Sequence, residues 1–153
     1  MITVRTEILS PQALAASAEC VALMSAAQSV AGARCIHTDF DVDATALAAD
    51  DAADVFYAVA RHDANGGSPV AILGAEIADK LERGWLRGPF VASAFAATPE
   101  HFATGANHAL QAMLARAGAR VKQLDALVET SHVRALDWYA ENGFVPVRKH
   151  SNY

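Results

Sequence analysis

The sequence predicts a single α/β (α+β) domain over residues 1–153, with a mixed and mostly antiparallel sheet flanked by about four helices. Alternating apolar and polar residues indicate a strand near the N-terminus, and turn-forming runs separate three more strands within 55–91. Helical three-and-four spacing follows over 99–117, and another apolar strand comes after it. A helix that joins two strands makes them parallel, so we expect one parallel pair at the centre of the sheet.

Length and composition are typical of one globular domain of a cytoplasmic protein. The chain has 153 residues, of which 53% are hydrophobic and 19% are charged, which is enough to bury a core. A net charge of −5 argues against nucleic acid or an anionic membrane as the main partner. Cys20 and Cys35 are too few for a disulfide framework, so we expect reduced thiols. The polar N-terminal strand resembles neither a signal peptide nor a membrane span.

Local signals define the helices of the N-terminal third. Residues 2–9 alternate as a strand, and Ser10-Pro11 begins a helix that continues to Gly32. Asp43 can cap a second, short helix that reaches about Ala53. Two helices are therefore expected before the antiparallel strands begin.

The last of the three antiparallel strands, Trp85–Val91, is interrupted by Gly88-Pro89. Proline cannot donate to a sheet ladder and glycine weakens one, so the strand should bend or bulge here. One interpretation is a simple irregularity of the sheet edge. The other is that the strand splays away from its neighbour and leaves a slot.

A helix with a clear start and stop is predicted near the C-terminus. Thr130 or Ser131 can cap its start, and Asn142-Gly143 supplies the left-handed residue that ends it. Between them Leu136 and Tyr139 lie on one helical face, so the phenol points toward the interior. Taken alone, this pattern favours a core tyrosine whose hydroxyl finds a partner.

The same segment resembles a signature of the GNAT superfamily of N-acetyltransferases. That signature is Asn-x-x-Ala, then an aromatic residue and Tyr, then Gly-Phe at the next strand. Here it reads His132-Val-Arg-Ala135, Trp138-Tyr139 and Gly143-Phe144, with histidine in place of the leading asparagine.

The resemblance implies acetyl-CoA as cosubstrate and gives particular residues a role. Tyr139 would be the general acid near the sulfur of acetyl-CoA. The slot at the bent strand would receive the pantetheine arm, which would pair with the backbone of Phe90, Val91 and Ala92. His132 would contact the same arm, because it can donate a hydrogen bond as asparagine does.

A second feature of the family, a glycine-rich turn that binds the CoA diphosphate, is only partly present. The best match ends in Gly105, Ala106 and Asn107, whose backbone N–H groups would meet the phosphates at a helix N-terminus. Thr98-Pro99 is a competing helix start. The sequence leaves open whether the helix begins at Pro99, with Gly105 inside it, or at Gly105.

The chain ends with one more expected strand, Phe144–Lys149, where the GNAT pattern has two. The sheet is then one strand short, or residues 150–153 form a stub, or a partner chain supplies the missing strand. Because open edges associate, we expect a homodimer.

The expected function is transfer of an acetyl group from acetyl-CoA to a primary amine of an unidentified small-molecule or peptide acceptor. Glu76 and Glu129 are candidate general bases, although for each taken singly a solvated charge is the favoured interpretation. No histidine or cysteine pair has zinc-ligand spacing, so no metal is expected. The alternatives are a non-catalytic GNAT-like domain that binds acyl-CoA or a protein partner, and a plain α/β ligand-binding domain.

Overall fold

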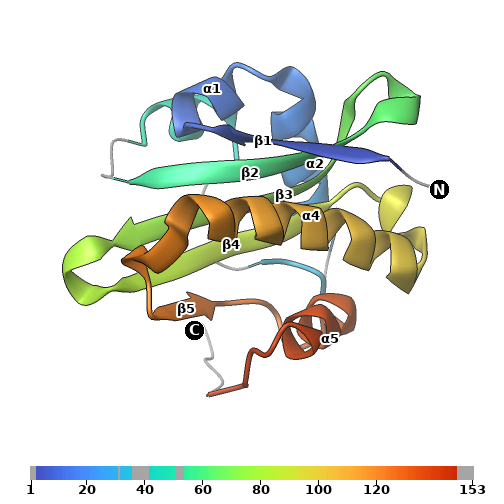
Figure 1. Cartoon of the computed structure of the whole chain (residues 1–153). Helices are drawn as coiled ribbons and strands as arrows, with labels where there is room; N and C mark the ends of the chain where they lie inside the picture. Colours follow the sequence, from blue (N-terminus) through green and yellow to red (C-terminus); the bar gives the residue numbers. More distant parts are fainter. Residues whose placement is uncertain (1–2, 31, 36–41, 51–53, 148–153) are drawn as a thin grey trace.

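The computed structural model describes residues 3–30, 32–35, 42–50 and 54–147. Within these residues five strands form one sheet, and helices cover both of its faces (Figure 1). The strands are β1 (Val4–Leu9), β2 (Val55–His62), β3 (Ser68–Ala78), β4 (Arg83–Val91) and β5 (Gln123–Ala126). The α-helices are α1 (Pro11–Ala15), α2 (Ala18–Gln28), α3 (Ala44–Ala48), α4 (Pro99–Ala117) and α5 (Val133–Glu141).

The sheet confirms the predicted fold class. Its strand order is β1-β2-β3-β4-β5, the first four strands are antiparallel, and β4 and β5 are parallel. The long helix α4 is the crossover between the two parallel strands, as the sequence predicts. In the described part of the chain the parallel pair lies at one end of the sheet rather than at its centre, because no described strand follows β5.

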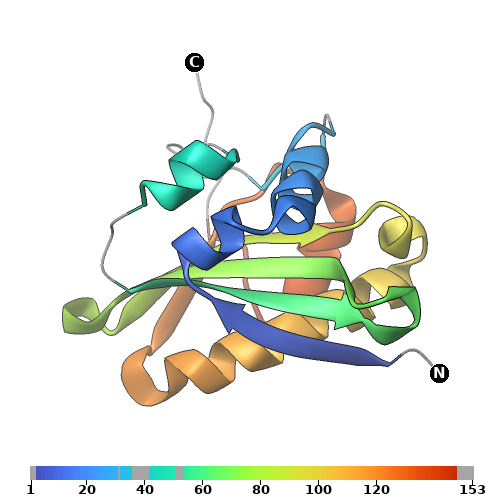
Figure 2. The ribbon, with the colours of Figure 1, turned by 90° about the horizontal axis from the view of Figure 1, so that it is seen from above.

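Two apolar layers hold the helices against the sheet. Helices α1, α2 and α3 lie over one face, and α4 and α5 pack against the other (Figure 2). Strand β2 supplies both layers, because alternate side chains point to opposite faces. Tyr57 and Val59 contact the first layer, whereas Phe56 and Ala58 contact the second. This arrangement explains why β2 is buried over six consecutive residues.

The helix expected over residues 10–32 is in fact two helices. Ser17 lies between them and caps α2, because its side chain accepts from the Cys20 amide at 3.4 Å. The sequence interpretation placed Ser17 inside one continuous helix. It was wrong because serine can end one helix and cap the next.

The expected last strand is absent from the described residues. Residues 144–147 form no ladder, and the side chains of Val145 and Val147 are 77% and 85% exposed. Residues 148 and 149 of the expected strand lie outside the described residues. The predicted strand was wrong over 144–147, although its first residue, Phe144, packs against the Tyr139 ring at 4.9 Å.

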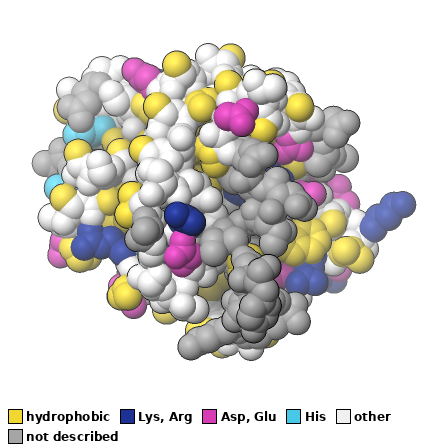
Figure 3. Space-filling model, turned by 180° about the vertical axis from the view of Figure 1, so that it is seen from behind, with side chains coloured by type: hydrophobic (Ala, Val, Ile, Leu, Met, Phe, Trp, Pro, Cys, Tyr) yellow, Lys and Arg dark blue, Asp and Glu magenta, His cyan; other side chains and the backbone are white. Residues whose placement is uncertain are grey.

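On the side opposite to Figure 1, basic and acidic side chains are scattered among uncharged ones (Figure 3). In the part of the chain described here, no helix has the length and apolar character needed to cross a membrane.

The outer edge of β5 gives the first prediction. No described strand pairs with this edge, and unpaired edges associate with other chains. We expect a homodimer, and light scattering measures the mass directly. Replacing Val145 and Val147 together by lysine should favour the monomer, because both lie in the exposed segment after α5. Leu114→Lys, on the exposed side of α4, is the matched control and should keep the dimer. A monomeric wild-type protein would contradict the prediction.

Candidate functional site

The site is built around a break in β4. At Gly88-Pro89 the register with β3 shifts, since Phe90 pairs with Ile72 but Arg87 pairs with Gly74. Gly88 has φ of +116° and precedes a cis peptide bond. A Cβ atom at Gly88 would lie 2.9 Å from the Phe90 nitrogen and 3.0 Å from the Ile72 oxygen, so only glycine fits. The bend predicted from the sequence is therefore present.

Strand β5 leaves β4 just before this break. The two strands pair from Arg83 to Leu86 of β4 and no further. The edge of β4 that faces β5 therefore has no strand partner beyond Leu86, within the described residues. This is the splayed geometry that the sequence left as one of two interpretations.

Tyr139 of α5 fills part of the gap. Its hydroxyl donates to the Gly88 carbonyl at 2.7 Å, and its side chain is 5% exposed. Burial raises the pKa of Tyr139 well above its ordinary value, and the nearby Cys35 adds to the shift. The phenol therefore keeps its proton at neutral pH and is a hydrogen-bond donor at the bend.

Cys35 reaches the same bend from the chain segment after α2. Its Sγ–H donates to the Pro89 carbonyl at 3.7 Å. Burial raises the pKa of Cys35 to about 12, and the charge of Glu129 adds to the shift. Cys35 is thus an uncharged thiol, and both cysteines are free and buried.

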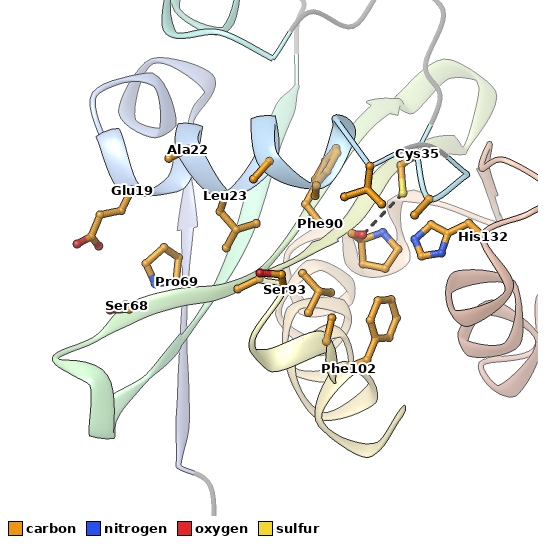
Figure 4. A pocket seen from close by; sticks show the side chains of 18 residues that line it. Glu19, Ala22, Leu23, Cys35, Ser68, Pro69, Phe90, Ser93, Phe102 and His132 are labelled. Atoms are coloured by element: carbon orange, nitrogen blue, oxygen red, sulfur yellow. Dashed lines mark hydrogen bonds between the residues drawn. The ribbon is translucent and has the colours of Figure 1, made fainter. Parts of the chain in front are cut away.

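A pocket of about 660 Å³ opens beside the bend, between α2, the end of β4 and the start of α4 (Figure 4). Its lining is mostly apolar, and the polar side chains among the lining residues are Glu19, Ser68, Ser93 and His132. The volume is within the usual range for small-molecule sites, roughly 300–1,000 Å³. The pocket therefore has room for a ligand that is largely uncharged.

Four of the residues predicted to bind cofactor line this pocket together. Phe90 and Val91 end β4, Ala92 follows them, and His132 lies at the start of α5. They come from segments about forty residues apart in the chain, and the sheet and the crossover helix bring them to one place.

The other three predicted cofactor residues lie elsewhere. Helix α4 begins at Pro99, where the Thr98 side chain accepts from the His101 amide at 3.2 Å. This decides between the two helix starts that the sequence left open. Gly105, Ala106 and Asn107 are therefore in the second and third turns, where backbone amides take part in the helix's own hydrogen bonds.

The surroundings of these three residues explain their identity without a phosphate. A Cβ atom at Gly105 would lie 3.2 Å from the Ala71 side chain, so glycine allows α4 to approach β3 closely. Ala106 is fully buried in the core. The Asn107 side chain accepts from the Trp138 indole at 2.8 Å and so ties α4 to α5. The structure does not bring these residues to the pocket.

His132 caps α5 and lines the pocket. Its Nδ1 accepts from the Ala135 amide at 3.4 Å, and its ring meets the Phe102 ring edge-on at 6.1 Å. Burial lowers the pKa of His132. Glu129 acts in the opposite direction, and Arg134 lowers the pKa further. The imidazole is therefore neutral at pH 7.

The two candidate bases occupy different surroundings. Glu129 follows β5, lies 3.7 Å from Arg34 and accepts from the Ser131 hydroxyl at 3.5 Å. It is close enough to His132 and Cys35 to affect the pKa of each. Glu76, in contrast, lies 3.6 Å from the Arg87 guanidinium in a second cluster, on the face covered by α1, α2 and α3.

This second cluster was not anticipated from the sequence. Arg87 is 8% exposed and donates to Asp50 at 3.1 Å and to the Tyr57 hydroxyl at 2.8 Å. Burial acts to lower the pKa of Arg87, but Tyr57 and Asp50 outweigh it and the guanidinium stays charged. An arginine in the otherwise apolar segment Trp85–Val91, directly before Gly88-Pro89, was the available signal.

Among the described residues, no group of three or more His, Cys, Asp or Glu side chains could hold a metal ion.

Comparisons with known proteins address the fold. No protein-family model matches the sequence, and no curated protein sequence matches it. An acetyltransferase from Trypanosoma brucei has a similar structure, with a TM-score of 0.60 and 15% identity over 99% of both chains. An integron cassette protein from V. cholerae has a TM-score of 0.63 and 14% identity, over 100% of this chain and 92% of its own.

A third similar structure is an aminoglycoside acetyltransferase from an uncultured soil metagenomic sample. Its TM-score is 0.63 at 17% identity, over 99% of this chain and 97% of its own. The chain has the GNAT fold. The splayed parallel pair and α5, with Tyr139 turned toward the gap, are elements that the sequence resemblance implied. At these identities the likeness concerns the GNAT fold alone.

The Tyr139 hydroxyl gives the second prediction. Tyr139→Phe keeps the ring but leaves the buried Gly88 carbonyl without this donor. The free energy of unfolding should fall by about 1 kcal/mol, the net contribution of one hydrogen bond. Urea denaturation measures the loss, and an unchanged midpoint would contradict the bond.

Proposed function

We propose that the chain binds acetyl-CoA and transfers its acetyl group to a primary amine. The observation that carries the proposal is the common location of Phe90, Val91, Ala92 and His132 around one pocket, beside the bend that Tyr139 contacts. Two of the three similar structures bear the name acetyltransferase, which supports an acyl-transfer reaction for this fold. The acceptor is a small molecule or a peptide with a free amine.

The pocket suits a pantetheine arm on two grounds. Beyond Leu86 the β5-facing edge of β4 has no strand partner among the described residues, so an extended arm has room to lie along it. The apolar lining suits the carbon skeleton of the arm, and His132 supplies a polar group at one side.

The diphosphate would lie at the turn before α4, not at the Gly105–Asn107 segment. Ser93 and Ala96 of this turn line the pocket. The guanidinium of Arg134 donates to the Ala96 carbonyl, so it puts a cation at the turn. An arginine and a nearby helix N-terminus together favour an anionic group.

In the proposed reaction, the amine nitrogen attacks the thioester carbonyl, the C–S bond breaks, and the thiolate needs a proton. Tyr139 is the proposed acid, because it is protonated at neutral pH and its hydroxyl contacts Gly88, the residue before Pro89 in the pocket wall. The base that takes the proton from the ammonium is Glu129 or Glu76. Glu129 lies nearer to the pocket residues Cys35 and His132, which favours it.

A non-catalytic acyl-CoA or partner-binding domain is the second candidate. Two observations favour it. The Tyr139 hydroxyl is already bound to the Gly88 carbonyl, and the diphosphate turn expected from the family lies inside α4. Catalysis by the wild-type protein on any amine would exclude this candidate.

The third prediction tests the pocket. Ala26→Trp places an indole in the pocket from an exposed position on α2, whereas Ser25→Trp, the matched control, adds it to an exposed position outside the lining. Acetyl-CoA at a hundredfold excess over its dissociation constant should stabilise the wild type and the control by about 2.7 kcal/mol. Thermal denaturation of the Ala26→Trp protein should show a clearly smaller shift. Equal shifts in all three proteins would place the ligand elsewhere.

The fourth prediction tests catalysis. Tyr139→Phe should reduce turnover by about 10²-fold or more while acetyl-CoA affinity changes little, because the hydroxyl acts on the leaving thiolate. Its effect on stability, about 1 kcal/mol, is too small to account for that loss.

Steady-state kinetics on a panel of amines provide the measurement, with calorimetry for acetyl-CoA affinity. Glu129→Gln and Glu76→Gln distinguish the two bases, since only loss of the true base should lower turnover comparably. Full activity of Tyr139→Phe would return Tyr139 to a core role. Binding of acetyl-CoA without acetylation of any amine would favour the non-catalytic candidate.

A further inference from the structure

Helix α5 begins differently from the other described helices. Its N-cap is the imidazole of His132, whose Nδ1 accepts from the Ala135 amide. The caps of α1 to α4 are the oxygen-bearing side chains Ser10, Ser17, Asp43 and Thr98. An imidazole nitrogen accepts a hydrogen bond only while it is unprotonated. The start of α5 therefore depends on a group that titrates near neutral pH.

The cap also fixes where the ring proton lies. Because Nδ1 of His132 accepts from the backbone, the proton of the neutral ring is on Nε2. The ring lines the pocket and meets the Phe102 ring in an edge-on contact. Figure 4 shows the imidazole on the same side of the pocket as Cys35. One residue thus contacts both the pocket and the start of α5.

Charged and uncharged groups from several segments of the chain surround His132. Glu129, before α5, favours the imidazolium, and Arg134, in the first turn of α5, opposes it. Cys35 is an uncharged thiol, and α4 contributes the apolar ring of Phe102. Glu19 of α2 lies at the opposite end of the pocket in Figure 4. The carboxylate of Glu129 raises the pKa of His132, but Arg134 and the apolar surroundings of the ring lower it by more.

We propose that His132 is a pH-sensitive positioning residue, whose neutral imidazole holds the start of α5 against the pocket and whose protonation releases it. Protonation removes the acceptor of the Ala135 N–H. It also puts a positive charge at a helix N-terminus, where the helix dipole opposes it, and into an apolar wall. Because α5 carries Tyr139, the change reaches the contact with Gly88.

The direction of the pH dependence follows from the pKa. Burial lowers the pKa of folded His132 below its ordinary value, about 6.5. Its contribution to stability is therefore complete above about pH 6.5 and is lost as the pH falls through the folded pKa. An uncharged ligand that fills the pocket desolvates the His132 ring further and so favours the neutral imidazole. By linkage, the affinity for this ligand should fall as the pH falls over the same range. This last step rests on the proposed binding of a pantetheine arm.

His132→Asn is the test, because asparagine is a good N-cap that does not titrate. Thermal denaturation from pH 8 to pH 5 should show the wild type losing stability relative to this variant. Each unit by which the pKa is lowered corresponds to a tenfold change in the folding equilibrium, or roughly 3–5 °C in Tm. His108→Asn on α4 is the control and should keep the wild-type pH dependence. If His132→Asn also keeps it, the proposal is overturned.

Two further measurements separate the cap from the ligand. Nitrogen NMR of the imidazole at pH 8 should show the proton on Nε2, and a proton on Nδ1 would overturn the cap. Calorimetry with pantetheine should show that the affinity of the wild type falls as the pH is lowered from 8 to 5, whereas the affinity of His132→Asn stays constant. Parallel pH dependence in both proteins would overturn the link to the pocket. Absence of pantetheine binding at any pH would overturn the proposed function and that link, while the difference in Tm would still support the cap.

Discussion

Pro89 has no N–H to give to a ladder, and Gly88 adopts a φ of +116°, so β4 cannot run straight between two neighbouring strands. Its pairing with β3 survives through a shift in register, whereas its pairing with β5 ends at Leu86. The gap between β4 and β5 follows directly from this backbone. The Tyr139 hydroxyl and the Cys35 thiol both donate to carbonyls at this break.

Helix α5 is held beside this gap and places a phenol at its edge. Trp138 donates to the Asn107 side chain of α4, and the next residue, Tyr139, then reaches the Gly88 carbonyl. The Tyr139 ring is packed between Trp138 and Phe144, at 4.8 Å and 4.9 Å. A helix anchored to α4 at its end and capped by His132 at its start therefore sets the position of the phenol.

Burial keeps the polar groups at the bend uncharged. It raises the pKa values of Tyr139 and Cys35 and lowers that of His132, so all three are neutral at pH 7. The charged cluster around Arg87 lies on the face covered by α1, α2 and α3. Neutral hydrogen-bonding groups and an apolar pocket suit the uncharged arm proposed above.

Signals a few residues apart were enough to predict most elements of the fold. Ser10-Pro11 and Asp43 begin helices because caps act on amides two or three positions away, whereas Thr98-Pro99 was one of two starts that the sequence left open. Gly88-Pro89 breaks β4 for an equally local reason. Ser17 was missed because serine is compatible with both a helix interior and a cap, and the choice depends on how α1 and α2 pack.

For the candidate site too, some features follow from local sequence and others from tertiary structure. The sequence by itself determined that Tyr139 faces inward, because helical spacing fixes the side on which it lies. The resemblance to GNAT proteins indicated Phe90 to Ala92 and His132, and the tertiary structure placed them around one pocket. Only the tertiary structure decided that Gly105 packs against β3, that Asn107 holds Trp138, and that Arg87 gathers Asp50 and Tyr57. These contacts join residues far apart in the chain, and no local spacing encodes which distant segments meet.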